Sequence, residues 1–468
     1  MTDHALTTPF SERAGAALKD RFLQEALGIA TTKFIDLRRD AFEGFPQGDA
    51  LRDRARAIKE ATLQRLDVHL GRLADNVERL GGRVHWADTG DDARDIILAL
   101  CRDKGVRMAV KSKSMATEEI ELNEALERAG VTPVETDLGE YIIQLAHEKP
   151  SHIIAPAIHK TKGQVAELIS AVAHERLAAD PEVLTAAARV LLREKFLQAE
   201  MGITGANFAV AETGTVVLVT NEGNGRMVTS LPRIHVAVMG IEKVIPSMTD
   251  LMVFLAILAR SATGQKLSSY TTLVRGPRQP GELEGPDEFH LILMDGGRSR
   301  QIAGKLREAL YCLRCGACLN VCPVYRQIGG HAYGHTYPGP IGILLTAMLK
   351  GTESVKDLAH ASSLCGACKD VCPVRIDIPR MLVGLREDLD RERIAPASER
   401  LVFRAFRRLL MSPAAFRLSA RAGRLLQTPF VRNGRLRSLP LFFGQWTKTR
   451  DLPPIAAKTF SERWKDLG

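Results

Sequence analysis

The spacing of its cysteines constrains this chain of 468 residues more than any other feature of the sequence. One run, CLRCGACLNVCP, begins at Cys312, places further cysteines at Cys315, Cys318 and Cys322, and ends in Pro323. In bacterial ferredoxins the same run wraps three thiolates around one cubane iron–sulfur cluster and sends the fourth to a second cluster. Zinc sites use paired CxxC motifs. The run therefore indicates iron and sulfide, with a zinc site as the alternative.

A second run, CGACKDVCP, begins at Cys365. When it is aligned with the first run, its opening position falls on Ser362. Crossed ligation between the two runs then assigns seven thiolates to two clusters. Cluster 1 takes Cys312, Cys315, Cys318 and Cys372. Cluster 2 takes Cys322, Cys365 and Cys368, so one of its irons has no cysteine ligand.

The missing ligand of cluster 2 has three interpretations. Ser362 supplies an alkoxide, or the cluster is a three-iron form, or the fourth iron is open to water, a substrate or a partner subunit. Serine is a weak ligand beside thiolate, so the sequence favours the second and third. A further explanation of Ser362 is that its hydroxyl caps a turn.

The rest of the sequence predicts a cytoplasmic protein. Its N-terminus lacks the apolar segment of a secretory signal. The longest apolar stretch, residues 251–259, is too short to span a bilayer and predicts a buried helix. In a reducing compartment, clustered cysteines point to metal binding or catalysis and not to disulfides. The eighth cysteine, Cys101, lies on a predicted helix and is interpreted as a small buried hydrophobic residue.

Positive charge is concentrated near the C-terminus. Residues 401–468 contain 14 Lys and Arg but only 3 Asp and Glu, whereas the formal net charge of the whole chain is +9. Such a segment can contact an anionic partner or a membrane surface without spanning it, or it is the solvated face of ordinary helices. We expect no nucleic acid partner, because no helix-turn-helix signal or aromatic stacking platform accompanies the charge.

Four segments are expected along the chain. They are a helical region over 1–60, an α/β domain over 61–298, a dicluster iron–sulfur domain over 299–385 and a basic helical region over 386–468. Helix and strand patterns alternate in the α/β domain, which indicates βαβ units and a mostly parallel sheet. Strands are predicted at 83–87, 107–112, 131–136, 152–156, 206–223 (a pair around a turn), 233–240, 271–276 and 289–297. A helix over 117–130 is predicted to have Thr117 as its N-cap.

Polar residues gather where the predicted strands end, the edge at which open α/β sheets bind ligands. They are Lys111, Lys113, Ser114, Glu135, Thr136, Asp137, His159, Lys160, Glu212, Asn221, Glu222 and Asn224. Lysine and histidine suit a carboxylate or phosphate, and a glutamate in a turn suits a general base; turn chemistry is the alternative. His235, in an apolar strand, is interpreted as a satisfied core histidine. No GxGxxG or GxxxxGK[ST] run supports NAD, FAD or ATP bound in the standard ways, although some flavin sites carry no fingerprint.

Four runs of the α/β domain resemble the lactate-utilisation domain. They are KSKSMATEEIELN from residue 111, VETDLGEYIIQLAHEKPSHIIAPAIHKT from 134, EMGITGANFAVAETGTVVLVTNEGNGR from 200 and LPRIHVAVMGIEKVIP from 231. Together with the two cysteine runs and the tail WTKTRDLPP (446–454), they make residues 20–465 similar to the lactate utilization protein B family.

The resemblance implies the three-layer α/β/α sandwich of the isomerase and CoA-transferase group. It also implies electron transfer in an NAD-independent complex that oxidises L-lactate to pyruvate. Lactate utilization proteins A and C are the implied partners, and L-lactate or another small carboxylate is the implied ligand. The cluster cysteines carry over as assigned above. Glu212 is a catalytic candidate by analogy with the CoA-transferase glutamate, and Lys113 is a second candidate.

Two other functions stay open. In the first, the chain is an isomerase or transferase whose clusters are structural, because a fold does not determine a function. In the second, it is a docking subunit whose basic region binds a partner or the membrane. Reversible reduction of the clusters distinguishes the first of these from electron transfer, and partner recovery after truncation tests the second.

Overall fold

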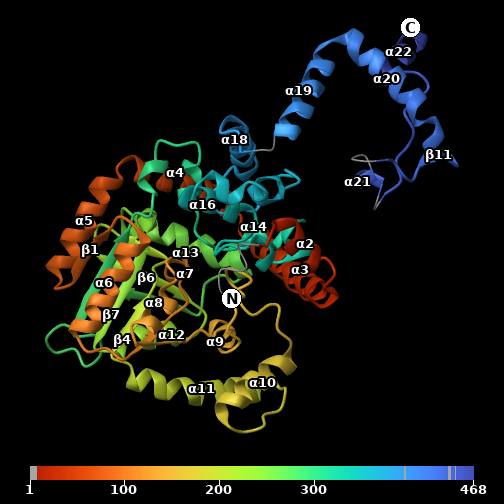
Figure 1. Ribbon diagram of the computed structural model, residues 1–468. Coiled ribbons are helices and arrows are strands. Elements are labelled where there is room, and N and C mark those ends of the chain that lie inside the picture. The colour runs from red at the N-terminus through yellow and green to blue at the C-terminus, as the bar shows by residue number, and fades with distance from the viewer. Residues whose placement is uncertain (1–7, 395–396, 441–443, 448–449, 468) are drawn as a thin grey trace. The chain divides into compact units, whose positions relative to one another are not determined.

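The computed structural model describes residues 8–394, 397–440, 444–447 and 450–467. The chain forms two compact units, the first ending at Leu389 and the second beginning at Asp390 (Figure 1). Both sheets of the α/β region and both cysteine runs belong to the first unit. Residues 448 and 449 of the tail run lie outside the described part.

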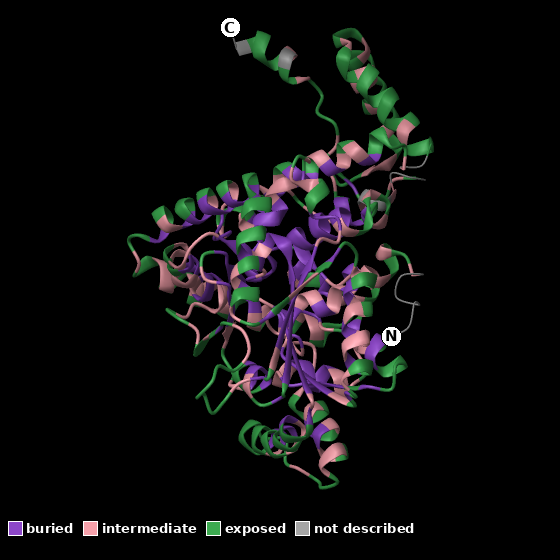
Figure 2. Ribbon diagram, turned by 90° about the vertical axis from the view of Figure 1, so that its left-hand side faces the viewer, coloured by how far each residue is buried: buried purple, intermediate pink, exposed green. Residues whose placement is uncertain are grey.

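A six-stranded sheet forms the centre of the first unit, and all of its neighbouring strands are parallel. Its order is β1 (Arg83–Ala87), β10 (Glu288–Met294), β7 (Ile234–Gly240), β4 (Met201–Thr204), β2 (Met108–Lys111) and β3 (Thr132–Glu135). The central strand β7 is buried along its whole length, as expected for a parallel sheet covered on both faces. Figure 2 shows the buried residues concentrated along this sheet. The predicted mostly parallel sheet is confirmed.

Two sets of helices cover the faces of this sheet. One set is α6 (Gly90–Asp103), α7 (Met115–Glu119) and α8 (Leu122–Arg128). The other is α9 (Leu138–Leu145), α11 (Pro181–Gln198) and α12 (Asn224–Ser230), with α10 (Lys162–Ala173) packed on α11. Cys101 of α6 is 2% exposed and packs in the first layer, as predicted. The likeness to the isomerase and CoA-transferase group stays a prediction.

A smaller sheet lies beside the first. Its order is β8 (Val244–Ile245), β5 (Phe208–Val210), β6 (Thr215–Thr220) and β9 (Tyr270–Val274). The antiparallel pair β5–β6 matches the predicted hairpin. Its turn requires glycine at position 214, because the residue has φ +69° and a Cβ atom there would lie 2.8 Å from the backbone of Asn76. Helix α13 (Met248–Thr263) contains the apolar stretch predicted to be buried, and Phe254 packs on Phe208 with ring centroids 5.1 Å apart.

The predicted helix over 117–130 is wrong in two respects. The segment forms the two short helices α7 and α8, separated by Glu121 in the left-handed region at φ 50°. Thr117 is not the N-cap, because the helix begins earlier and the side chain of Ser114 accepts the Thr117 N–H at 3.3 Å.

The predicted strand over 152–156 is also wrong. His152 Nδ1 accepts the backbone N–H groups of Ile154 (3.0 Å) and Ala155 (3.2 Å), so the segment folds into a bend. Strand β4, by contrast, was not predicted. Gly202 within it has low strand propensity, yet the position requires glycine because a Cβ would lie 2.0 Å from the Val228 carbonyl oxygen.

Helices from both ends of the first unit enclose the cysteine runs. The N-terminal helices are α2 (Phe10–Ala17), α3 (Arg21–Glu43), α4 (Gly48–Gln64) and α5 (Leu66–Arg79). Those of the cysteine segment are α14 (Ala317–Asn320), α15 (Tyr325–Ile328), α16 (Gly339–Lys350), α17 (Ala367–Asp370) and α18 (Ile378–Arg391). Helix α3 contacts both α14 and α13, so the N-terminal region ties the cysteine segment to the α/β region.

The second unit is largely helical and exposes apolar side chains. Its elements are α19 (Ala397–Met411), α20 (Pro413–Gln427), β11 (Val431–Arg432), β12 (Arg435–Leu436), α21 (Gly444–Thr447) and α22 (Phe460–Leu467). On α19, Phe406 is 54% and Leu410 49% exposed, one helical turn apart. Within the described residues, no helix has the length and apolar character needed to cross a bilayer.

Candidate iron–sulfur and ligand site

The two cysteine loops follow the same backbone path. The residue before the central cysteine is left-handed in each loop: Arg314 has φ 60° and Leu364 has φ 55°. A glycine with positive φ follows that cysteine in both. Side chains other than glycine rarely adopt this region, so its recurrence at equivalent positions marks the loops as structural repeats. The repeat aligns Ser362 with Cys312.

The Ser362 hydroxyl has the same hydrogen-bond partner as the aligned cysteine sulfur. The Arg314 N–H donates to Cys312 Sγ at 3.4 Å, and the Leu364 N–H donates to Ser362 Oγ at 3.2 Å. Arg386 of α18 donates to the Ser362 carbonyl at 3.1 Å and so fixes this loop. The Ser362 hydroxyl therefore caps its turn, which agrees with one interpretation of the sequence. Its oxygen has the position in this loop that the Cys312 sulfur has in the first loop.

Four cysteines line one small cavity. They are Cys312, Cys315, Cys318 and Cys372, the set assigned to cluster 1. All are buried; burial and the neighbouring thiols raise the pKa of Cys315 to about 12, and burial with the Cys312 thiol raises that of Cys372 to about 11. Metal binding needs thiolates, so these thiols release their protons when a metal binds. The donor set fits a cubane cluster.

The other three cysteines form a second group. Burial and the thiols of Cys322 and Cys365 raise the pKa of Cys368 to about 12. Cys322 and Cys368 are buried, whereas Cys365 is exposed. The Tyr325 N–H lies 3.5 Å from Cys322 Sγ, a contact that favours a thiolate. This set fits a cluster with one corner near the surface.

A buried ionic network adjoins the first group of cysteines. Its ion pairs join Arg298 to Glu119 (2.8 Å), Arg298 to Glu242 (2.7 Å) and Arg314 to Glu242 (3.3 Å). Lys243 donates to the Cys312 carbonyl at 3.4 Å, and Lys59 donates to the Glu242 carbonyl. Burial, helped by the charge of Lys243, lowers the pKa of Lys59 to about 7, and burial with Arg314 lowers that of Lys243 to about 8.

This network contains more cations than carboxylates. The two lysines and two arginines face two glutamates. Arg52 donates to the Cys372 carbonyl at 2.9 Å, but its charge is paired with Asp49 at 2.8 Å. Buried charge without a counter-ion is costly. A cubane with four thiolates carries a net charge of about −2 or −3 and would balance the excess. The network therefore fits an anionic cluster at Cys312.

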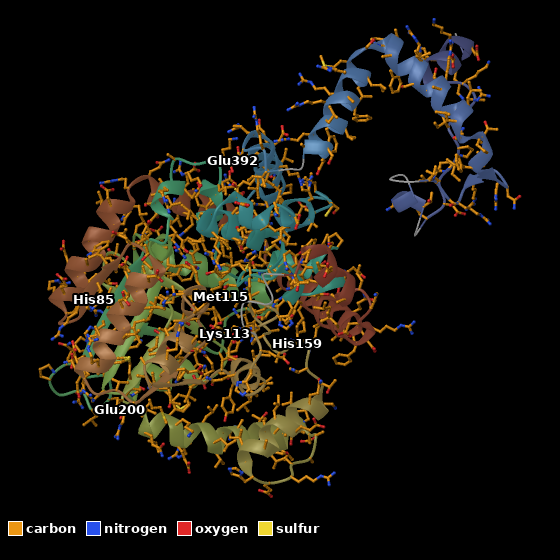
Figure 3. The ribbon with its side chains drawn as sticks, in the orientation of Figure 1. His85, Lys113, Met115, His159, Glu200 and Glu392 are labelled. Atoms are coloured by element: carbon orange, nitrogen blue, oxygen red, sulfur yellow. The ribbon has the colours of Figure 1, made fainter. Side chains whose placement is uncertain are left out.

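A cavity of about 530 Å³ lies between the carboxyl edge of the parallel sheet and the first cysteine loop. Lys113 follows β2 and Lys243 follows β7, and both line it. Figure 3 labels Lys113 and Met115 close to each other and His85 well away from them, on the left-hand side of the view. Cys315 lines this cavity as well as the small cysteine cavity. A ligand bound here would therefore lie against Cys315, one of the predicted cluster-1 cysteines.

Several predicted site residues meet at this cavity. They are Lys113, Ser114, Asp137, Asn221, Glu222 and Asn224. Beside them, Glu140 of α9 is a candidate that the sequence analysis missed. Its carboxylate lies 3.7 Å from Lys113 Nζ, and burial raises its pKa to about 8. A carboxyl group that titrates near neutral pH suits proton transfer.

The remaining predicted residues have other surroundings. Lys111 and Glu135 form a buried ion pair at 2.6 Å, and His159 contacts Glu148 at 2.7 Å. Glu212 is not among the residues described around the cavity; its carboxylate accepts the Met248 N–H at 3.1 Å. Its catalytic role stays a prediction. His235 is fully buried, as expected of a core histidine, and 2.9 Å separates its Nε2 from Thr204 Oγ1. Its Nδ1 has no hydrogen-bond partner among the described residues, so the predicted satisfied histidine is confirmed for one ring nitrogen only.

Three family models match successive parts of the chain. The LUD domain matches residues 70–294, the 4Fe-4S dicluster domain matches 308–376, and the C-terminal domain of lactate utilisation protein B matches 389–468. The dicluster match covers both cysteine runs. The chain thus contains a 4Fe–4S dicluster domain, in agreement with the iron and sulfide that the cysteine spacing indicates and not with zinc.

Similar proteins extend over nearly the whole chain. Lactate utilization protein B of Bacillus velezensis is 43% identical over 98% of this chain and 97% of its own. An Escherichia coli protein named uncharacterized electron transport protein YkgF is 42% identical over 98% of this chain and 96% of its own. A crystal structure of a DUF162 family protein from Deinococcus radiodurans is 12% identical, covers 49% of this chain and 98% of its own, and has a TM-score of 0.25, too low for a comparison. The chain belongs to the lactate utilization protein B family.

Proposed function

We propose that this chain is the iron–sulfur electron-transfer subunit of a complex that oxidises L-lactate to pyruvate. The observation that carries the proposal is the convergence of Cys372, from the second run, with three cysteines of the first run on one buried, cation-flanked cavity. Crossed ligation of this kind holds two clusters close together, as in two-cluster ferredoxins. The names of the Bacillus and Escherichia coli relatives support both lactate utilisation and electron transport.

In this proposal Cys312, Cys315, Cys318 and Cys372 hold cluster 1, a [4Fe–4S] cluster. Cys322, Cys365 and Cys368 hold cluster 2, a second [4Fe–4S] cluster with three cysteine ligands. Electrons pass from the buried cluster 1 to cluster 2, which meets the surface at Cys365. Lactate utilization proteins A and C are the partners, and the complex is cytoplasmic.

The experiment that tests this function is lactate-dependent reduction of the clusters. The anaerobically purified protein is mixed with L-lactate, alone and then with its partners, and cluster reduction is followed by EPR. We expect reversible reduction that requires lactate. Clusters that cannot be reduced and reoxidised would favour a structural role in an isomerase or transferase, with Glu212 and Lys113 as its catalytic candidates.

A docking role for the second unit is favoured by the exposed apolar side chains of α19. Phe406 and Leu410 lie one turn apart, with Arg404 before them and Arg408 between them in the sequence. An amphipathic basic helix of this kind suits a partner groove with acidic edges.

Changing Phe406 and Leu410 to serine should reduce recovery of partner proteins at least tenfold, because such anchors each contribute roughly 1–2 kcal/mol or more. The measurement is co-purification with an affinity-tagged partner. Cluster content should stay unchanged, and Val383→Ser on α18 is the matched exposed control. Equal recovery of both variants would remove the docking role of this face.

A further inference from the structure

A buried tyrosine hydroxyl lies close to the second group of cysteines. Tyr333 ends the short helical turn η4 (His331–Tyr333), between the two cysteine runs, and its side chain is 0% exposed. Within the described part of the chain, its Oη has no regular hydrogen-bond partner. Burying a hydroxyl without a partner is costly, whereas a phenylalanine ring would fill the same space without that cost. The Tyr333 hydroxyl therefore needs an acceptor.

The group that faces this hydroxyl is the Cys322 thiol. The Tyr333 and Tyr325 rings pack with their centroids 6.3 Å apart, and the Tyr325 N–H lies 3.5 Å from Cys322 Sγ. Burial raises the pKa of Tyr333 well above its usual range, and the Cys322 thiol raises it further. Burial also raises the pKa of Cys322, which the backbone N–H groups of Tyr325 and Val324 and the Tyr333 hydroxyl lower. These opposite effects are expected of an O–H group directed at a sulfur.

The chemistry of sulfur explains why this pair forms no regular hydrogen bond in the protein alone. A thiol is a weak acceptor. A thiolate bound to a cluster carries negative charge, and hydrogen bonds to an ionised acceptor are shorter and stronger than those to a neutral one. The Tyr333 hydroxyl is thus placed to donate once Cys322 is a cluster ligand.

Helix α2 holds the Tyr333 side chain in this position. Arg13 of α2 donates to the carbonyls of Ala332 at 3.0 Å and Tyr333 at 3.4 Å. From the same helix, the Phe10 ring packs on the Tyr333 ring with centroids 6.4 Å apart. A tyrosine hydroxyl lies on the axis of its ring, so a ring that is fixed on two sides also fixes the place of its oxygen.

This hydroxyl adds to a hydrogen bond that both cysteine loops share. Cys322 and Cys372 are the last cysteines of the two runs, and each has a backbone N–H directed at its sulfur, from Tyr325 at 3.5 Å and from Ile376 at 3.3 Å. Tyr333 supplies Cys322 with a side-chain donor beyond this repeated contact. The sulfurs of the two clusters therefore have different surroundings.

We propose that Tyr333 donates a hydrogen bond to the Cys322 sulfur of cluster 2 and thereby raises the reduction potential of that cluster. Reduction adds one electron and makes the cluster more negative, so an O–H dipole directed at its sulfur stabilises the reduced form more than the oxidised form. The hydroxyl keeps its proton in both states, and only an electron is transferred. This inference rests on the proposed function, in which Cys322 holds cluster 2 and cluster 2 carries electrons.

The test is a redox titration of the full-length protein with both clusters loaded, monitored by EPR under anaerobic conditions. Tyr333→Phe removes the hydroxyl and keeps the ring that packs on Phe10. At a fixed potential we expect the ratio of reduced to oxidised cluster 2 to fall about tenfold, which is about 59 mV for a one-electron couple. The potential of cluster 1 should move less.

Tyr325→Phe is the matched control. Its hydroxyl donates to the Ser151 carbonyl at 2.8 Å and not to a sulfur, and its backbone N–H is kept. This variant removes the same atom from a ring next to Tyr333, so both cluster potentials should equal those of the natural protein.

A second measurement needs no substitution. Growth with 3-fluorotyrosine labels all six tyrosines of the chain, and fluorine makes a phenol a stronger hydrogen-bond donor. The potential of cluster 2 should therefore rise in the labelled natural sequence and should not rise in labelled Tyr333→Phe. If Tyr333→Phe fails to retain cluster 2, shown by its iron and sulfide content, the labelled natural sequence decides alone.

The outcomes separate this inference from the proposed function. A cluster 2 that titrates reversibly, with one potential in the natural protein, in Tyr333→Phe and after fluorination, would overturn this inference and leave the proposed function in place. An equal fall in Tyr325→Phe would overturn it as well, because a general loosening of the loop would then explain the shift. Clusters that take up no electron at any potential would overturn both.

Discussion

Replacing Ser362 with alanine should cost cluster 2 its fourth iron. Ser362 Oγ accepts the same backbone hydrogen bond as Cys312 Sγ in the repeated loop, so its oxygen has the position of the missing ligand. Without that oxygen, three cysteines remain to hold the cluster. We expect the alanine variant to show a three-iron EPR signal and to contain about one iron fewer per chain, measured as iron and sulfide content after anaerobic purification.

The reverse change gives the opposite result. Ser362→Cys supplies a thiolate, which binds iron better than an alkoxide does, so this variant should keep four irons under mild oxidation that removes one from the natural protein. Ser354→Ala is the control, because the Ser354 hydroxyl donates to the Gly351 carbonyl, away from both cysteine runs in the sequence. If Ser362→Ala keeps the spectrum and iron content of the natural protein, the hydroxyl merely caps its turn.

Replacing Lys243 with methionine should lower the midpoint potential of cluster 1. The lysine lies against the Cys312 carbonyl, and a nearby positive charge stabilises the more negative, reduced state of the cluster. At an effective dielectric constant of about 20 and a separation of roughly 8–10 Å, one charge contributes about 2 kcal/mol. For a one-electron couple this corresponds to a decrease of roughly 50–100 mV.

The measurement is a redox titration of each cluster monitored by EPR. Cluster 2 serves as an internal reference, since its potential should move less than that of cluster 1. Lys160→Met, which removes a charge paired with Glu148, should shift neither potential. A Lys243→Met protein with both potentials unchanged would show that Glu242 already compensates the lysine charge.

Much of the fold could be predicted because it rests on local patterns. Short apolar runs that alternate with amphipathic segments identified the parallel sheet, and the turn at Gly214 identified the hairpin. The misses occurred where a side chain overrides the local pattern. His152 bends a segment of strand-like residues because its side chain accepts two backbone hydrogen bonds. Gly202 weakens the strand pattern of β4, but glycine is required there because the backbone lies so close to the Val228 carbonyl of α12.

The candidate site was only partly visible in the sequence. Cysteine spacing is fixed by cluster geometry and could be interpreted directly. The cationic network could not, because Lys59 comes from the N-terminal helices and Arg298 from the loop after β10, and only tertiary packing brings them to Glu242. Glu140 was missed because it lies within an apolar helix, where the neighbouring isoleucines dominate the pattern.

The contact of Arg52 with the Cys372 carbonyl also bears on how the chain matures as it is synthesised. Arg52 lies in α4, near the start of the chain, and its partner lies 320 residues later. Helix α4 therefore cannot make this contact with the second cysteine loop until the chain has been synthesised as far as Cys372. The N-terminal helices can complete their packing on the cysteine segment only late in synthesis.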